Sequence, residues 1–485
     1  MPVSGQAYIA FDGVGTLLDG LLVCAGGVLG DLGGGTAVGN HPGPIDAWPS
    51  HSPIVRAAGR PPWQALPQAM HQTPGKVPRP ILGDVAVLLD LDDPELVADP
   101  YPVFAARRAA HPIAWDDGLG MWLAFGHAQA NAVLRHRGLG RIWADRLPLP
   151  AFESFNLIHR NALLEMEPPE HPRLRRLVAA AFARGHIERL RPWVEDLAAR
   201  LVADLLERAA GGRPVDLVPS YADELPVAVI AELLGVPESD RPLLRPWSNA
   251  IVKMYEYDRP VDVESAAEIA AAEFVAYLRE LAAQRRTAPG EDLVSHLVSV
   301  RDADGDRLTE DELVTTCILL LNAGHEATVN VTCNGMLALL QHPEELTRLR
   351  ADPGLIPSAV EELMRYDSPL QLFERTAVRD VEIGDVTVRE GTKVAALLGS
   401  ANRDPTVFSD PDRLDLGRTD NPHISFGAGI HFCIGAPLAR VELQASFAAL
   451  LMNTATIELA DLPVRRPEFV IRGLVDLPVI LTPAE

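Results

Sequence analysis

The 485-residue chain lacks several features that mark large classes of protein. Its four cysteines, Cys24, Cys317, Cys333 and Cys433, contain no CxxC pair, which argues against a disulfide scaffold or a zinc ribbon. Acidic residues outnumber basic ones by 66 to 43, and a net charge of −23 is unfavourable for binding nucleic acid. No apolar run reaches 18 residues, and no basic residue precedes Arg56, so neither a membrane span nor a secretory signal is expected. We therefore expect a cytoplasmic protein with no nucleic-acid or membrane partner.

The first 80 residues have little that could build a packed core. They contain 14 of the 37 glycines, many prolines and few charges, and they show no clear periodicity. We expect residues 1–80 to form a Gly/Pro-rich, poorly ordered extension. Residues 81–485 are then the functional domain.

From Leu89 onward, long helical patterns dominate and strand-like runs are short. Helices are predicted over Pro192–Ala209, Asp223–Leu234, Glu264–Gln284, Glu310–Leu340, Pro343–Arg350, Ile356–Tyr366 and Ala436–Leu451. Strands are predicted over Ile113–Trp115, Met121–Phe125, Phe373–Ala377, Val381–Ile383, Val386–Val388 and Lys393–Leu398. Because the two kinds of element do not alternate, the expected fold is mainly α with small β sheets.

Three short strings resemble functional motifs but each lacks a required feature. Residues 11–19 resemble a phosphatase nucleophile loop, but Val14 stands where the second carboxylate is needed. Asp302, Asp304 and Asp306 resemble a calcium loop with its turn glycine misplaced, so we expect an acidic turn before a helix capped by Thr309 and Glu312. The glycines at 33–35 lack the strand and helix of a dinucleotide site.

The most informative string is FGAGIHFCIG, residues 426–435, which places one cysteine, Cys433, in a glycine-framed loop ahead of a predicted helix. Pro437 suits the first turn of that helix. A helix N-terminus stabilises a nearby anionic sulfur, and glycines let backbone N–H groups approach it closely. A thiolate held in this way is suited to bind one axial position of an iron. A buried, inert cysteine is the alternative.

This string resembles the haem-binding loop of the cytochrome P-450 superfamily, FxxGxxxCxG. Glu362 and Arg365, one turn apart on a predicted helix, are similar to the ExxR pair of that family, and Arg413 in Pro411–Leu414 is the expected third member, although the family usually has Phe where Leu414 stands. The resemblance covers about residues 90–485. It implies the P-450 fold, with a long central helix crossing the haem, and haem b ligated by Cys433. The resemblance also implies that Phe426, Gly427 and Gly435 are among the residues that bind the haem.

The carboxylates of a bound haem need cationic partners. His171 and Arg175 share one face of a predicted helix and resemble the HxxxR pattern of the family. Arg375 and His431 match the other two positions that the resemblance assigns to this task. His325 and the remaining histidines have no matching role and are expected to be structural.

The centre of the predicted helix Glu310–Leu340 carries NAGHEAT, residues 322–328. Gly324 is unfavourable in a helix interior and suggests a close ligand. Glu326 matches the acid that relays protons in the family. The next position usually carries a threonine, but here it is Ala327, and Thr328 follows one residue later. Either a bulge brings Thr328 into place, or the substrate hydroxyl and waters complete the relay, which we favour, or the chemistry differs.

The resemblance implies a monooxygenase that inserts one atom of O2 into an apolar small molecule such as a secondary metabolite, terpene, polyketide or lipid. Electrons are expected from NAD(P)H through a ferredoxin reductase and a ferredoxin of the 2Fe-2S or a similar type, and the protein is expected to be a monomer. Segments expected to line the substrate site are Leu147–Leu163, Trp247–Tyr257 and Pro369–Phe373. The alternatives are a haem-thiolate enzyme with non-hydroxylating or peroxide-driven chemistry and a non-catalytic haem-binding protein.

Overall fold

The computed structural model describes residues 88–91, 93–179, 182, 184–257, 259–301 and 305–484. The expected extension 1–80, the phosphatase-like string, the glycines at 33–35, Cys24 and two of the three aspartates of the calcium-like loop lie outside these residues. The described residues all belong to one contact unit, Asp84–Glu485.

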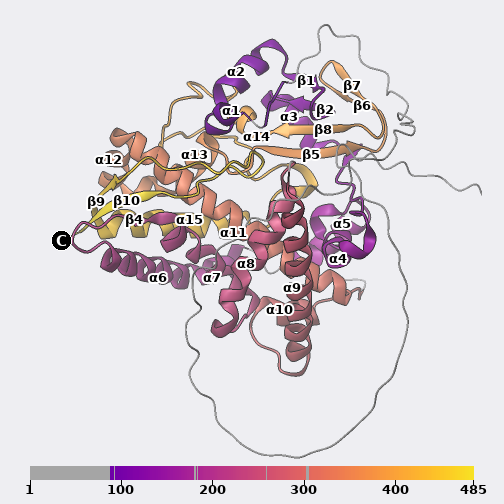
Figure 1. The fold of residues 1–485 in the computed structure, drawn as a ribbon, viewed down its shortest axis with the longest axis horizontal. Coiled ribbons are helices and arrows are strands. Elements are labelled where there is room, and N and C mark those ends of the chain that lie inside the picture. Colours follow the sequence, from indigo (N-terminus) through magenta and orange to yellow (C-terminus); the bar gives the residue numbers. More distant parts are fainter. Residues whose placement is uncertain are drawn as a thin grey trace, which may run out of the picture. The chain divides into compact units, whose positions relative to one another are not determined.

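Helices make up most of this unit and strands are few, as predicted (Figure 1). The α-helices are α1 (Pro94–Ala98), α2 (Tyr101–Ala110), α3 (His127–Arg135), α4 (Glu153–Arg160), α5 (Glu170–Ala179), α6 (Arg184–Arg208), α7 (Glu224–Leu234), α8 (Arg241–Val252), α9 (Val261–Thr287), α10 (Leu293–Ser299), α11 (Glu310–Gln341), α12 (Pro343–Ala351), α13 (Ile356–Tyr366), α14 (Leu398–Ala401) and α15 (Ala436–Asn453). The shorter turns of helix are η1 (Leu149–Ala151), η2 (Leu163–Glu165), η4 (Val218–Ala222), η5 (Glu238–Asp240), η6 (Lys253–Tyr255), η7 (Pro353–Leu355) and η8 (Gly429–His431).

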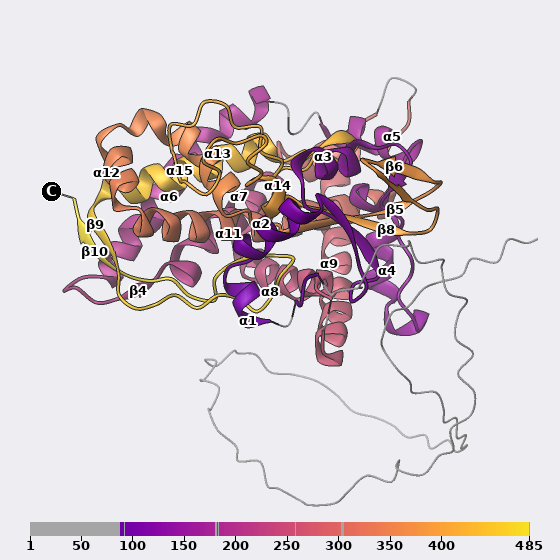
Figure 2. The same cartoon turned by 90° about the horizontal axis from the view of Figure 1, so that it is seen from above.

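The strands form three small sheets. They are β1 (Ile113–Asp116), β2 (Met121–Ala124), β3 (Leu139–Gly140), β4 (Val215–Asp216), β5 (Leu372–Ala377), β6 (Val381–Ile383), β7 (Val386–Val388), β8 (Lys393–Leu397), β9 (Thr454–Leu459) and β10 (Pro478–Pro483). The largest sheet has the order β1-β2-β8-β5-β3, in which only β2 and β8 pair in parallel. The sheet β4-β10-β9 lies at the opposite end of the unit from this one, as both ribbon views show (Figures 1 and 2).

Helix α11 is the centre of the largest hydrophobic core. It lies between α15 and α9 in both views (Figures 1 and 2), and its side chains are buried along most of its length. Its start is set by the predicted capping box, in which the Thr309 hydroxyl accepts from the Glu312 N–H and the Glu312 carboxylate accepts from the Thr309 N–H. The long helix predicted to cross the domain is therefore confirmed, with its C-terminus one residue later.

The largest error in a predicted helix boundary is at the start of α6. Helix α6 begins at Arg184, before the predicted start at Pro192, because this proline lies inside the helix. A proline there costs one backbone hydrogen bond. Packing compensates for that cost, since α6 is among the helices in closest contact with α15.

Candidate functional site

The loop Phe426–Gly435 is held by backbone geometry that its glycines make possible. Gly427 and Gly429 have φ values of +70° and +73°, which side-chain-bearing residues rarely adopt. A Cβ on Gly429 would also lie 2.5 Å from the backbone oxygen of Leu134 at the end of α3. The Cys433 N–H donates to the Phe426 carbonyl (3.0 Å), so the loop closes on itself before α15 begins. Gly435 has an ordinary backbone conformation, and a Cβ there would stand 3.9 Å from the Cys433 sulfur.

The sulfur of Cys433 has an environment that the other described cysteines lack. Burial raises its pKa, but hydrogen bonds from the backbone N–H groups of Gly435 and Ala436 and the charges of Arg175 and Arg440 oppose this. For Cys317, burial is the leading cause of a pKa of about 12, and no cation opposes it. Donors and cations aimed at one sulfur favour its anionic form. Cys433 is therefore the described cysteine best placed to act as a thiolate.

Phe426 and Arg440 support this loop from the side. The guanidinium of Arg440 lies over the Phe426 ring, 4.4 Å from its centre. The same guanidinium donates two hydrogen bonds to Glu361 on α13, at 2.6 and 2.8 Å. Sequence reasoning missed this Glu361–Arg440 pair, because its two members are far apart in the chain.

The four residues expected at the haem carboxylates gather around this loop. The rings of His171 and His431 are 4.5 Å apart, and Arg175 donates to the carbonyl of Phe432 at 2.8 Å. His171 is 2% exposed, and its Nε2 has no hydrogen-bond partner among the described residues. Burial and the neighbouring charges of His431 and Arg175 lower the pKa of His171 to about 4.

Arg375 is the most unusual member of this cluster. It is 4% exposed, and its guanidinium donates to the backbone carbonyl of Glu374 at 2.7 Å. No ion pair joins it to a carboxylate in the part of the chain that the structure describes. Burial and the positive charge of Arg141 lower its pKa to about 10. The carboxylates of Glu167 and Glu165 oppose this shift but form no ion pair with Arg375, and a buried guanidinium that is not directly paired with an anion is costly.

His431 already has one acidic neighbour that the sequence did not reveal. Its Nε2 is 2.9 Å from Glu167, which precedes α5, and the same carboxylate oxygen accepts from the Arg141 N–H at 2.8 Å. His431 and these hydrogen bonds lower the pKa of Glu167, although burial acts in the opposite direction as the largest single cause. His171 is the fourth residue after Glu167, but nothing in this spacing indicates a contact between Glu167 and His431.

The ExxR pair is present, but its third member differs from the prediction. Glu362 and Arg365 are both fully buried and joined by two hydrogen bonds of 2.7 and 2.8 Å. Arg418, not Arg413, donates the further bond to Glu362 (3.1 Å). Arg413 is exposed and contributes its backbone carbonyl, which accepts from Arg365. The chain turns after Asp410, so Arg413 presents its carbonyl to the network instead of its side chain.

The centre of α11 has one accessible face in an otherwise buried helix. Ala323 is exposed and Ala327, one turn later, is partly exposed. Thr328 is 4% exposed, and the helix runs through this region without a bulge. The structure therefore excludes the alternative in which a bulge brings Thr328 to the position of Ala327.

Two other residues of this helix have different surroundings from those expected. A Cβ on Gly324 would meet the Ile230 side chain of α7 at 2.9 Å, so close packing of α7 on α11 explains this glycine, not a ligand. Glu326 is buried and accepts a hydrogen bond from Arg466 at 2.9 Å. The expected proton-relay acid is thus part of an ion pair with a residue near the C-terminus.

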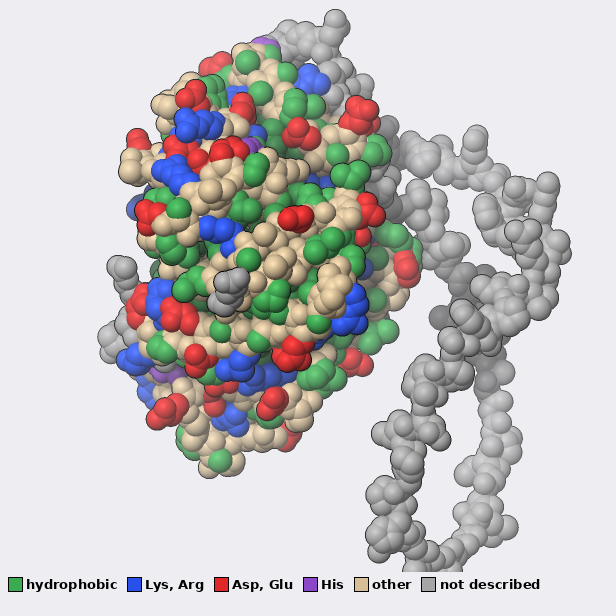
Figure 3. Space-filling model, turned by 90° about the vertical axis from the view of Figure 1, so that its left-hand side faces the viewer, with side chains coloured by type: hydrophobic (Ala, Val, Ile, Leu, Met, Phe, Trp, Pro, Cys, Tyr) green, Lys and Arg blue, Asp and Glu red, His purple; other side chains and the backbone are tan. Residues whose placement is uncertain are grey.

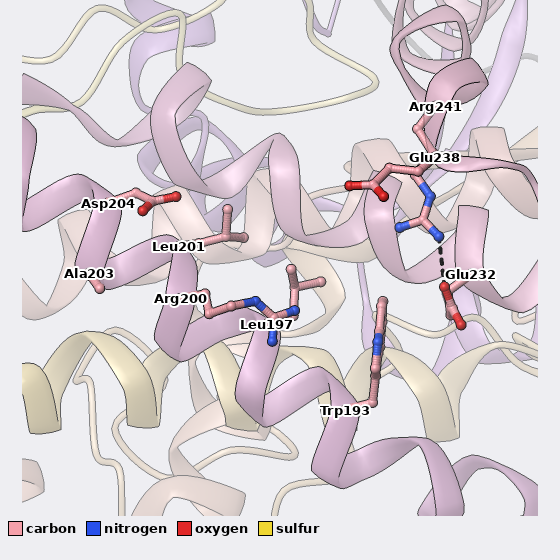
Figure 4. Close-up of a pocket in the computed structure, with 9 residues that line it drawn as sticks. All are labelled: Trp193, Leu197, Arg200, Leu201, Ala203, Asp204, Glu232, Glu238 and Arg241. Carbon is pink, nitrogen blue, oxygen red and sulfur yellow. Dashed lines mark hydrogen bonds and ion pairs between the residues drawn. The ribbon is translucent and has the colours of Figure 1, made fainter.

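A surface groove lies elsewhere and contains none of these residues. It is lined by α6, α7, η5 and the first residue of α8, with Trp193, Leu197 and Leu201 facing charged side chains that include the Arg241–Glu232 ion pair of 2.7 Å (Figure 4). On the face in Figure 3, basic and acidic side chains are interspersed instead of forming a patch of one sign. Within the described residues, no helix combines the length and the apolarity needed to cross a membrane.

Comparisons with known proteins agree with this geometry. The cytochrome P450 family model matches residues 243–353 and 354–458. The biotin biosynthesis cytochrome P450 of Bacillus subtilis (strain 168) is 38% identical, over 79% of this chain and 97% of that protein. The cytochrome P450 monooxygenase PikC of Streptomyces venezuelae is 42% identical, over 79% of this chain and 92% of that protein.

Solved structures give the same result. P450BioI in complex with an acyl carrier protein ligated to hexadec-9Z-enoic acid superposes with a TM-score of 0.75 at 36% identity, covering 80% of this chain and 100% of that one. CalO2 also superposes with a TM-score of 0.75, at 30% identity, covering 82% of this chain and 100% of that one. Haem and O2 are the cofactor and co-substrate of this family. With its mainly helical fold, its cysteine loop and these relatives, the chain belongs to the cytochrome P450 family and is a cytochrome P450 monooxygenase.

Proposed function

We propose that residues 81–485 form a cytoplasmic, monomeric haem-thiolate domain that inserts one oxygen atom of O2 into an apolar small molecule of secondary metabolism. Electrons come from NAD(P)H through a ferredoxin reductase and a 2Fe-2S-type ferredoxin. The observation that carries this proposal is the convergence on one loop of a sulfur supplied with N–H donors and a buried guanidinium, Arg375, that forms no ion pair within the described residues.

The residues present fit haem b. Cys433 would ligate the haem iron, and Phe426, Gly427 and Gly435 would form the loop around it. His171, Arg175, Arg375 and His431 bind the two haem carboxylates, which supply the ion-pair partner that Arg375 lacks among the described residues. Glu362 and Arg365 hold the segments beneath the loop. When bound, haem activates O2 for insertion into a C–H bond.

The other residues bind the substrate and move protons. Segments Leu147–Leu163 and Trp247–Tyr257 contribute α4 and α8, which both pack against α11, and Pro369–Phe373 leads into β5. The accessible Ala323–Ala327 face of α11 is proposed to border the substrate. Glu326, paired with Arg466, passes protons toward this face, and a substrate hydroxyl with waters takes the part that the family resemblance assigns to a threonine at position 327.

The test is oxygen incorporation from 18O2 by the haem-loaded protein. The assay supplies NADPH, a surrogate ferredoxin reductase and ferredoxin, and two apolar probes, 6-deoxyerythronolide B and hexadec-9Z-enoic acid. The expected result is an 18O-labelled product that requires both the redox partners and NADPH. Product formed with hydrogen peroxide but never with the redox partners would favour the peroxide-driven alternative, which Ala327 makes worth testing. Haem binding without any product would favour the non-catalytic alternative.

Ala327→Thr is expected to change the fraction of consumed NADPH that appears as product. The added hydroxyl lies on the accessible face of α11, where it offers a hydrogen bond that the wild-type chain obtains from elsewhere. One hydrogen bond is worth roughly 1 kcal/mol, or about fivefold in a ratio of competing rates. Ala327→Val is the matched control, because valine has nearly the shape of threonine without the hydroxyl. Equal coupling in Ala327→Thr, Ala327→Val and wild type would contradict the proposed relay.

A further inference from the structure

His325 is a fully buried histidine at the centre of α11 that connects this helix to two others. Its Nδ1 is 3.4 Å from the hydroxyl of Ser248 on α8, and its Nε2 is 3.8 Å from Asp223, which immediately precedes α7. Ser248 is 0% exposed and Asp223 is 4% exposed. Burying three polar groups together is costly unless they interact, so their convergence requires an explanation.

The position of His325 on α11 separates it from the accessible face. It precedes Ala327 by two residues, which places the two side chains roughly 200° apart around the helix. The ring therefore extends toward α7 and α8, the same side on which Gly324 allows Ile230 to approach. His325 acts on the helices that pack against α11 instead of facing the proposed substrate directly.

Helix α8 is anchored by polar contacts to three different elements. Arg245 forms an ion pair with Asp223 at the start of α7, and Trp247 donates to Glu273 on α9 at 2.8 Å. Ser248 is the α8 residue that contacts α11 through a polar group, and its contact is His325. The Ser248–His325 contact thus fixes the distance between α8 and the central helix, while the other two anchors fix α8 to its neighbours.

We infer that His325 is a positioning residue that sets the width of the substrate site by holding α8 against α11 through Ser248. This inference rests on the proposed function, because it takes α8 to be one wall of that site. The Nε2 atom of His325 has no hydrogen-bond partner within the described residues, and the Asp223 carboxylate lies 3.8 Å from it. Loss of the ring releases α8 from α11, and the wall then moves more freely.

The experiment compares His325→Phe, Ser248→Ala and the conservative His325→Gln in the haem-loaded protein. The probe is 4-phenylimidazole, whose nitrogen ligates haem iron while its phenyl ring occupies the substrate site. Imidazole alone is the control, because it ligates the iron but is too small to contact α8. His325→Phe and Ser248→Ala are each expected to weaken 4-phenylimidazole binding about fivefold, the value of one hydrogen bond, and to leave imidazole binding unchanged. His325→Gln, which keeps a hydrogen-bonding group, should restore affinity to within about twofold.

Amide hydrogen exchange provides a second measurement that requires no turnover. In ligand-free protein, the amides of α8 should exchange faster in His325→Phe and in Ser248→Ala than in wild type, and the double variant should add little to either. Unchanged α8 exchange, or fully additive effects of the two variants, would overturn the inference. So would an equal loss of affinity for imidazole, which indicates general damage to the haem site. If turnover fails while these results hold, the proposed reaction is wrong and the contact is still confirmed.

Discussion

Replacing Cys433 with serine is expected to abolish oxygen insertion, with a loss on the order of 100-fold or more. Partners that merely orient a metal ligand are worth about 10- to 100-fold, so loss of the ligand itself should cost at least as much. Burial raises the pKa of Cys433, and the N–H groups of Gly435 and Ala436 and the charges of Arg175 and Arg440 act in the opposite direction, toward an anionic sulfur. A serine hydroxyl remains neutral in the same place. The reduced carbon-monoxide complex should therefore lose the red-shifted Soret band that sulfur ligation produces, and 18O incorporation should fall with it.

The matched control is Cys317→Ala, which removes a sulfur from the same protein. Cys317 is 0% exposed in α11, and burial raises its pKa to about 12, so it stays a thiol. This variant is expected to keep the red-shifted Soret band at full intensity, although the small cavity lowers the free energy of unfolding by about 1–2 kcal/mol. Retention of the band in Cys433→Ser, or its loss in Cys317→Ala, would show that Cys433 is not the axial ligand.

The sequence predicted the elements whose stability is local. Helix α13 and strands β6 and β7 have the predicted boundaries, and α11 begins at its predicted capping box. In these segments, periodicity, caps and turns all agree. Strands β9 and β10 were missed, because their pairing joins segments about 20 residues apart across a loop and depends on contacts that no local pattern encodes.

The residues of the candidate site show the same contrast between local patterns, which the sequence reveals, and contacts between distant segments, which it does not. The residues Phe426–Gly435 were proposed from one contiguous string, and His171 and Arg175, which share a helix face, were proposed because they resemble the HxxxR pattern of the family. Partners contributed by distant segments were not found: Glu167 at His431, Glu361 at Arg440 and Arg466 at Glu326. An ion pair between distant segments depends on how the chain folds back, which residue spacing does not record.

Gly324 and Arg413 show how a correct motif can support a wrong local interpretation. A helix-interior glycine indicates a close approach, but the approaching group is the Ile230 side chain. Arg413 lies in the expected string, but because of a turn it contributes its backbone carbonyl, not its side chain, to the network. The guanidinium that donates to Glu362 belongs to Arg418 instead. In both cases the motif correctly indicated the region of the contact. The path of the backbone, which the motif does not encode, determines which atoms are in contact.

Glu362→Gln is expected to lower the free energy of unfolding by about 3–5 kcal/mol, the usual cost of removing one member of a buried ion pair. Glu362 and Arg365 have no exposed side-chain surface, and Glu362 also accepts from the Asp415 N–H at 3.0 Å and from Arg418. The amide leaves the Arg365 guanidinium buried with carbonyl partners alone. Because domains have total stabilities of about 5–15 kcal/mol, denaturant titration should show a clearly lower midpoint, and the variant should retain less haem after purification.

The same titration distinguishes the two candidates for the third member of this network. Arg418→Ala removes the hydrogen bond to Glu362 and a guanidinium whose side chain is 10% exposed, so a loss of about 1–3 kcal/mol is expected. Arg413→Ala removes an exposed side chain but keeps the carbonyl that Arg365 uses, and its effect should stay within about 0.5 kcal/mol. A larger loss for Arg413→Ala than for Arg418→Ala would mean that the Arg413 side chain completes the network, as the motif alone had suggested. The structure predicts the opposite order of stability losses. The Arg418 guanidinium pairs with Glu362 in addition to Arg365, whereas the Arg413 side chain does not contribute to this network.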